Sequence, residues 1–423
     1  MPDPVSLKRQ LGLWEVTLTG VGIILGAGIY VLIGKAAAVA GNAIWLSFAL
    51  AALIAVFTGL SYAELSAMFP YAGAEYEYTA HAFNRRLAFV VGILVILSGV
   101  VGASTVALGF SGYFQDLTGL PPLPTAAALI ILVSLLIARG IGESTRIAIL
   151  FTLVETAGLL GIIAIGLPHL GSVDYLEMPS GLPGVFSAAA LVFFAYQGFE
   201  SIAKLAEETK VPERNIPRGL LYAIAISTIL YLLVAVAAVS AIGWEHLAAS
   251  PAPFAEIAAH LGAESSVVFA LIALAATANT VLIMLLTSSR ITYSMARDGS
   301  LPLRLGRVHR SRQTPMAAIA GLGIVALLFI LPADIALVAE ITNFSLFIAF
   351  LVINAAVIVL RYRSPDLPRP FRVPLNPRGI PLLPLGGLLV SAFFLLLLSP
   401  QSLLVGTFLL LLTWATSYLP RKR

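Results

Sequence analysis

The fold is decided by a short stretch near the start of the chain, which reads GVGIILGAGIY at residues 20–30. The stretch lies inside an apolar run at 12–34, long enough to cross a hydrocarbon core of about 30 Å, for which about 20 residues are needed. Its central Gly26-Ala27-Gly28 favours either close packing against another helix or a local unwinding of the span. Unwinding frees backbone N–H and C=O groups, which are tolerated at membrane depth only where they line a cavity.

A second apolar run, at 184–208, is interrupted in a similar way. It reads FFAYQGFE at residues 193–200, so an amide, a glycine and a carboxylate stand within an otherwise apolar helix. The two interrupted runs are the first and the sixth along the chain, and a repeat with an odd number of helices must run inverted relative to its copy. Two broken helices in corresponding positions of two repeats indicate a transporter binding site.

The composition is that of a bilayer protein. The 423 residues are 59% hydrophobic and 11% charged, whereas a soluble domain carries about 25% charged residues. The N-terminus lacks a small-residue cleavage site, so the first span is expected to remain in the mature protein. Because the chain has no cysteine, disulfides, thiolate metal sites and cysteine nucleophiles are excluded.

The pattern predicts an all-α integral membrane protein with about twelve transmembrane helices. The expected spans are 12–34, 42–69, 86–115, 122–138, 143–168, 184–208, 216–243, 265–296, 316–332, 335–361, 379–398 and 401–419. Two shorter pieces, 71–84 and 251–261, lie between spans on opposite sides. No soluble domain is appended.

The basic residues gather on one side of these spans. They are Lys8, Arg9, Arg85, Arg86, Arg139, Arg146, the runs Lys204–Arg218, Arg290–Arg312 and Arg361–Arg378, and Arg421–Arg423, while only Lys35 falls on the other side. Short cytoplasmic loops collect Lys and Arg. We therefore expect a multi-pass protein of the cell membrane with cytoplasmic N- and C-termini, and no nucleic-acid partner.

The broken helices predict the chemistry of the ligand. The positive end of a half-helix, equivalent to about +0.5 charge, faces an anion such as a carboxylate, and unwound carbonyls accept hydrogen bonds from an ammonium. The natural ligand is therefore a zwitterion such as an amino acid.

Four stretches resemble a known family. They are Leu7–Gly12 leading to Gly22–Tyr30; Phe194–Glu200 with Glu207–Thr209 and Pro212–Pro217; Ser289–Arg290 through Met295–Gly299 to Thr314–Pro315; and Leu360–Phe371. In these stretches, spread over nearly the whole chain, the sequence resembles the amino acid-polyamine-organocation (APC) superfamily, although it reads GIY where the family's first helix usually reads GIF. The resemblance implies a single membrane domain of the leucine-transporter fold, with inverted five-helix repeats at about 12–170 and 182–362 and two further helices at 379–419.

The resemblance also implies a substrate site at the two breaks. It assigns carboxylate binding to the backbone of Gly26, Ala27 and Gly28, and ammonium binding to the carbonyls of Ile24, Phe194, Ala195 and Gln197, with Gly198 in the same break. The Phe194 ring corresponds to an aromatic gate over the substrate. Glu200 corresponds to an acid that orders the broken helix.

Coupling is expected to involve Glu155. Proton-coupled members resembling this chain carry a lysine in helix five, where the match of Gly142–Arg146 through Thr152–Glu155 places Glu155. An acid within a membrane helix costs about 2.5 to 3.5 kcal/mol and is functional by default, and burial favours its protonated form. The alternative is a neutral, hydrogen-bonded carboxyl that holds helices together.

Several polar residues lie along span eight, where most bond the carbonyl of the preceding turn. They are Asn279, Thr280, Thr287, Ser288 and Ser289. Sodium-binding relatives of the fold take hydroxyl and carbonyl ligands from helices one and eight, which makes Ser288 and Ser289 the alternative cation site.

The sequence therefore predicts a secondary active transporter of amino acids that works by alternating access with proton-coupled symport. Apolar surface from Phe194 and Phe199 favours neutral side chains. The alternatives are an amino acid or amine exchanger without ion coupling, a sodium-coupled symporter and, more remotely, a channel or a membrane-embedded enzyme. No catalytic cluster, metal or cofactor is expected, since all five histidines fall at span ends or in loops and no H-E-x-x-H helix is present.

Overall fold

The fold is described from a computed structural model. It covers residues 11–71, 74–139, 144–309, 312 and 314–418, with the side chains of 144–150, 207 and 378 outside the description. The motif residues Leu7–Gln10 and Gly142–Glu143 and the terminal basic residues Lys8, Arg9 and Arg421–Arg423 therefore lie outside the described residues. In the described part, the only β-pairing is a single bridge between Leu11 and Thr209.

The described residues form an all-α fold, as predicted. Its helices are α1 (Leu13–Ile24), α2 (Gly28–Ala40), α3 (Ile44–Met68), α4 (Ala74–Ala82), α5 (Arg85–Thr118), α6 (Pro122–Arg139), α7 (Ser144–Gly166), α8 (Gly181–Val192), α9 (Pro212–Ala249), α10 (Pro253–Ala259), α11 (Ala263–Arg297), α12 (Met316–Phe329), α13 (Ile335–Arg363), α14 (Leu382–Leu396) and α15 (Pro400–Thr416). Short 3₁₀ turns are η1 (Gly41–Ala43), η2 (Leu167–His169), η3 (Phe193–Tyr196), η4 (Phe199–Glu208), η5 (Leu303–Gly306) and η6 (Pro377–Gly379).

By length and apolar composition alone, eight helices of the described chain can cross a membrane, or nine if α14 and α15, bent by 117°, are one span. This test joins α2 and α3 across η1 and omits the short helices α1 and α12. Twelve spans result when α1 and α2 are taken as one broken span, α3 and α12 are added, and α14 and α15 are counted separately. The helix bounds differ from the expected spans by a few residues.

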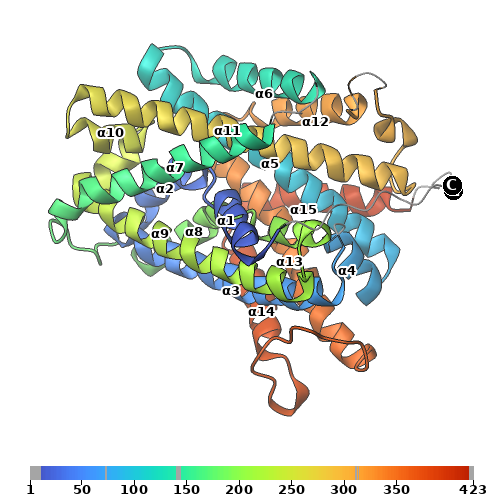
Figure 1. Ribbon diagram of the computed structural model, residues 1–423. Helices are drawn as coiled ribbons and strands as arrows, with labels where there is room; N and C mark the ends of the chain where they lie inside the picture. The colour runs from blue at the N-terminus through green and yellow to red at the C-terminus, as the bar shows by residue number, and fades with distance from the viewer. Residues whose placement is uncertain (1–10, 72–73, 140–143, 310–311, 313, 419–423) are drawn as a thin grey trace.

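The long helices pack side by side. In Figure 1, α7, α9 and α11 run across the view, and α7 contacts both of the others. Helix α5 packs against α11 and α13, and α3 packs against α9. The two short helices lie at opposite ends of the bundle, with α4 on the right of the view and α10 on the left. This agrees with the expectation that 71–84 and 251–261 face opposite sides.

Both predicted breaks are present. Helix α1 ends at Ile24 and α2 begins at Gly28, while α8 ends at Val192 and gives way to η3 and η4. The chain just before α1 is joined to the chain just after η4 by the Leu11–Thr209 bridge. In this bridge Leu11 N–H donates to Glu208 O at 3.0 Å, and Lys210 N–H donates to Leu11 O at 2.8 Å. The start of α1 therefore lies beside the end of η4.

The two breaks cross at two glycines. A Cβ on Gly28 would lie 2.6 Å from Ala195 Cα, and a Cβ on Gly198 would lie 2.7 Å from Ile23 Cγ2. Gly198 also has φ of +120°, a backbone conformation that residues with a side chain rarely adopt. Glycine at these positions is what allows the two interrupted helices to touch.

Candidate functional site

A cavity lies beside the crossing of the breaks and holds about 650 Å³ of free space, including its open mouth. Its polar lining comprises Ser98, Glu155, Gln197, Glu200, Ser201, Lys204, Asn279, Thr280, Thr287 and Ser288. Its apolar side chains are Ile23, Val95, Ile283, Met284 and Ile291, and backbone is contributed by Gly22, Gly26, Gly99 and Gly198.

Three of the eight residues that the resemblance assigns to the substrate line this cavity. They are Gly26, Gln197 and Gly198. Glu155 and Ser288, assigned to coupling, line it as well. The fold therefore brings α1, α5, α7, α11 and the second break around one polar space.

The other five assigned residues are enclosed between the breaks and do not line the cavity. Ile24, Ala27, Gly28, Phe194 and Ala195 are all buried. Ala27 N–H donates to Thr280 Oγ1 at 3.0 Å.

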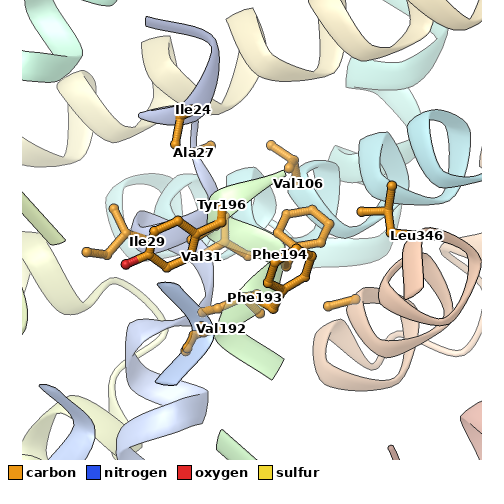
Figure 2. Close-up of a cluster of buried hydrophobic side chains, with 14 of the residues drawn as sticks. Ile24, Ala27, Ile29, Val31, Val106, Val192, Phe193, Phe194, Tyr196 and Leu346 are labelled. Atoms are coloured by element: carbon orange, nitrogen blue, oxygen red, sulfur yellow. The ribbon is translucent and has the colours of Figure 1, made fainter. Parts of the chain in front are cut away.

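The Phe194 ring lies in an apolar cluster and not over the cavity. Figure 2 shows Phe193 and Phe194 packed together, with Val106 of α5 and Leu346 of α13 nearby. Phe199 is also fully buried, where it contacts Tyr62 and Phe350. The apolar surface expected from Phe194 and Phe199 therefore comes from other residues of the lining.

Two of the carbonyls assigned to an ammonium already accept a hydrogen bond from Tyr231 of α9. The Tyr231 hydroxyl lies 2.6 Å from Ile24 O and 2.8 Å from Ala195 O. A third assigned carbonyl, Phe194 O, accepts from Gln197 N–H at 3.2 Å. Sequence reasoning missed Tyr231, although a tyrosine in the middle of an apolar span needs a partner for its hydroxyl and is a usable signal.

Residues of α13 and of the second break hold three further backbone groups. Asn343 Nδ2 donates to the α8 carbonyls Ala190 O and Leu191 O at 2.7 and 3.1 Å. Gly198 N–H donates to Glu200 Oε2 at 2.9 Å, which agrees with an ordering role for Glu200. The backbone at both breaks is thus stabilised by side chains of α9, α11 and α13 and, at the second break, also by Glu200.

Glu155 is 1% exposed, and its Oε1 has no hydrogen-bond partner in the described part of the chain. The Tyr30 hydroxyl donates to the main-chain carbonyl oxygen of Glu155 at 2.7 Å and not to its carboxyl group. Glu155 lines the cavity. A buried acid at a cavity wall can take up a proton or bind a cationic group.

Ser288 and Ser289 have different environments. Ser288 lines the cavity and lies 3.5 Å from Ile96 O of α5, whereas Ser289 Oγ donates to Leu286 O of its own helix at 2.7 Å. Within the described residues, the α11 hydroxyl that bonds to the break between α1 and α2 is that of Thr280, which accepts from Ala27 N–H. The structure therefore separates the two serines and places only Ser288 at the cavity.

A second buried acid, Glu64 of α3, is fully paired. It accepts from Arg361 Nε at 3.0 Å and from Arg361 Nη2, from Val373 N–H at 2.8 Å, and lies 3.6 Å from Arg369 Nε. The cluster joins α3 to α13 and to the chain that follows it, away from the cavity lining.

The cavity extends from the crossing toward Lys204. The Nζ atom of Lys204 lies 3.3 Å from Oε1 of Glu75 in α4. On the other side of the crossing, the rings of Tyr30 and Phe254 meet edge to face, with centroids 4.8 Å apart, and Tyr113 donates to Tyr30 O at 3.0 Å. The described conformation is therefore hollow on the α4 side of Tyr30, and a second pocket, lined by Tyr30, Lys35, Tyr113 and Pro253, lies on the α10 side.

Comparison with known proteins identifies the family. Residues 11–416 match the amino acid permease family. Among similar proteins, the branched-chain amino acid permease BcaP of Bacillus subtilis (strain 168) is 34% identical over 92% of this chain and 88% of its own length. The methylthioribose transporter of the same organism is 34% identical over 88% of this chain and 85% of its own length.

A more distant relative is the vacuolar cationic amino acid transporter 4 of Arabidopsis thaliana, 31% identical over 86% of this chain and 65% of its own length. The match over almost the whole chain agrees with the two broken, crossing helices and with the resemblance in the motifs. The chain therefore belongs to the amino acid permease family of the APC superfamily, and it is a multi-pass membrane transporter of amino acids with the leucine-transporter fold.

Proposed function

We propose that this chain is a secondary active transporter that carries neutral amino acids by alternating access, in symport with protons that bind at Glu155. The main support is the buried carboxyl group of Glu155, which lies in the wall of the cavity beside the two breaks. One of its oxygens has no hydrogen-bond partner in the described part of the chain. The two breaks correspond to each other in inverted repeats at about 12–170 and 182–362, with 379–419 outside them.

The substrate class is supported by the lining. Five apolar side chains, Ile23, Val95, Ile283, Met284 and Ile291, face the same space as the polar residues. They offer a surface to an aliphatic or aromatic side chain. The relatives are named for branched-chain amino acids, cationic amino acids and methylthioribose, so their names alone do not select among side chains.

Proton coupling is supported by the place of Glu155. Protonation removes the charge of a carboxyl group, so the protein can pass between its two conformations without exposing a charge to the membrane interior. One charge moved through the membrane field is worth about 2.3 kcal/mol per 100 mV. Sodium is the competing coupling ion, with Ser288 as a hydroxyl ligand at the cavity. An exchanger without ion coupling is the other candidate.

The proposed orientation places the N- and C-termini in the cytoplasm of a cell whose plasma membrane holds the protein. It rests on Lys204, Arg297 and Arg361 at the α4 end, against the exposed Lys35 at the other end. Short cytoplasmic loops collect positive charge. The cavity then faces the cytoplasm in the described conformation.

A thermal-shift screen of the detergent-purified protein against the twenty amino acids and common amines tests the substrate class, since a bound ligand stabilises by RT ln(1 + [L]/Kd). Alanine, leucine or phenylalanine should raise the melting temperature more than arginine, lysine or putrescine. The reverse order contradicts the proposed class. Counterflow of labelled amino acid that needs no pH gradient would instead favour the exchanger.

A pair of glycine variants tests the site. Gly26→Ala adds a methyl group at the cavity, 3.2 Å from Thr280 Oγ1, whereas Gly321→Ala adds one in open space. The first should reduce the ligand-induced shift and the second should leave it unchanged. Equal shifts in both variants contradict the placement of substrate at the first break.

A further inference from the structure

An apolar groove lies on the outside of the bundle between α5, α13 and α15, which contact one another. It holds about 720 Å³ of free space, including its open side, and every residue that lines it is aliphatic or aromatic. Leu411 and Trp414 at its edge are exposed. Because the bundle spans a membrane, this surface faces lipid and not water.

The groove begins at the α4 end of the bundle, toward which α15 lies in Figure 1. Helix α5 begins there at Arg85 and lines the groove with Leu87, Val90, Val91 and Leu94. The seven residues from the first to the last of these cover about 10 Å along the helix. One leaflet is half of a hydrocarbon core of about 30 Å. The groove therefore has room for the part of one acyl chain that is nearest the head group.

A positive charge stands at the mouth of the groove. At about 100° per residue, Arg86 lies about 40° around α5 from Val90, on the groove side of the helix. Its guanidinium carbon Cζ lies 4.9 Å from the centroid of the Tyr418 ring. That ring meets Trp414, which lines the groove, with the two centroids 6.2 Å apart. The guanidinium group, a tyrosine and a tryptophan therefore gather where the groove reaches the membrane surface.

These features select an occupant with an apolar chain and an anionic head. Tryptophan and tyrosine favour the level of the lipid head groups, and arginine binds phosphate oxygens through paired N–H donors. Basic pockets between transmembrane helices bind anionic head groups. A zwitterionic phospholipid carries the same phosphate, but its ammonium group cancels the net charge, so arginine attracts it less.

We propose that an anionic phospholipid binds in this groove, with one acyl chain between α5, α13 and α15 and its phosphate at Arg86. The proposed orientation makes this a lipid of the cytoplasmic leaflet. Leu94 lines the groove and the next residue, Val95, lines the substrate cavity. The lipid therefore contacts the same turn of α5 that forms part of the cavity wall, and its binding depends on neither the substrate nor the coupling ion.

The test is native mass spectrometry of the full-length protein in detergent, titrated with dioleoyl phosphatidylglycerol or dioleoyl phosphatidylcholine. The two probes have the same chains and differ in net charge. The first phosphatidylglycerol should bind about fivefold or more tightly than the first phosphatidylcholine, from the attraction of one arginine near the membrane surface. Equal affinities would overturn the proposal.

Two arginine variants locate the head group. Arg86→Gln should remove most of the preference for phosphatidylglycerol. The matched control is Arg85→Gln, which makes the same change of charge about 140° around the helix from Val90 and should have a clearly smaller effect. Both arginines are exposed, so both variants should fold. Equal losses in the two would indicate general attraction to the protein surface and would overturn the site.

Two leucine variants locate the chain. Leu411→Trp fills the groove and should weaken binding of both lipids, whereas Leu412→Trp, at an exposed position outside the lining, should not. Unchanged lipid binding in Leu411→Trp overturns the proposal, and if this variant also loses a dimer peak, the groove is a contact between two copies of the chain. If Arg86→Gln fails to fold, the leucine pair decides by the same criteria.

Discussion

Two glutamates, Glu64 of α3 and Glu155 of α7, are equally buried, at 1% exposure each. Glu64 is held by Arg361, Arg369 and the N–H of Val373. Glu155 has an oxygen without a hydrogen-bond partner in the described chain and faces the cavity. Burial alone therefore does not identify a coupling residue, and the number of partners of the carboxyl separates the two.

The difference has a physical basis. A buried carboxyl group with two guanidinium groups beside it fixes the geometry of α3 and α13, since removal of one partner leaves an uncompensated charge. A buried carboxyl with a free oxygen can exchange its proton or a ligand without breaking the fold. Glu64 thus stabilises the structure, whereas Glu155 is the residue that we propose to change its protonation state during transport.

The largest expected effect is on stability at Glu64. Glu64→Leu leaves the Arg361 side chain, 4% exposed, without its carboxylate, which should cost about 3 to 5 kcal/mol. The protein should lose its folded peak in size-exclusion chromatography or melt at a much lower temperature. Glu155→Gln, a near-isosteric change at an equally buried site, should melt close to wild type.

The control for this comparison is the double variant Glu64→Leu/Arg361→Met. Because it removes both charges, it should recover part of the lost stability. Equal melting temperatures for Glu64→Leu and Glu155→Gln would mean that the two acids do not differ in structural role.

An intermediate effect is expected on access of water-soluble reagents. The chain has no cysteine, so an introduced one is the only thiol. Ser201→Cys, in the cavity lining, should react with a charged thiol reagent about tenfold or more faster than Ser66→Cys, which is fully buried in α3 two residues from Glu64, since access limits thiol modification. Equal rates would contradict the hollow cavity beside Glu155.

The smallest effect is expected at Tyr30, whose hydroxyl bonds the main-chain carbonyl of Glu155 and not its carboxyl. Tyr30→Phe should reduce the free energy of unfolding by about 1 kcal/mol and leave the response of uptake to a pH gradient intact. A loss of the pH response in this variant would show that coupling depends on the hydrogen bond to the backbone.

Much of the fold could be predicted from the sequence, because span length and apolar composition are local properties. The breaks at Gly26–Gly28 and Gln197–Gly198 were also visible as small and polar residues within apolar runs. The assignments of Gly26 to the substrate and of Glu155 to coupling followed from the family resemblance, and the structure shows that both residues line one cavity.

The side chains that hydrogen-bond to the freed backbone groups could not be predicted. Tyr231 lies 207 residues from Ile24 in sequence, and Thr280 lies 253 residues from Ala27. No local sequence pattern predicts contacts between residues so far apart. The tight contact at Gly28 could not be predicted either. A Cβ there would lie 2.6 Å from Ala195 Cα, so Gly28→Leu should disrupt the crossing.

The most direct test of the central claim is uptake of labelled leucine into proteoliposomes under an imposed pH gradient or an imposed sodium gradient, for wild type and Glu155→Gln. We predict that a pH gradient alone drives accumulation by wild type, that a sodium gradient alone does not, and that Glu155→Gln still exchanges leucine at equal pH but no longer concentrates it. Full pH-driven accumulation by Glu155→Gln, or accumulation by wild type only with sodium, would contradict Glu155 as the proton site.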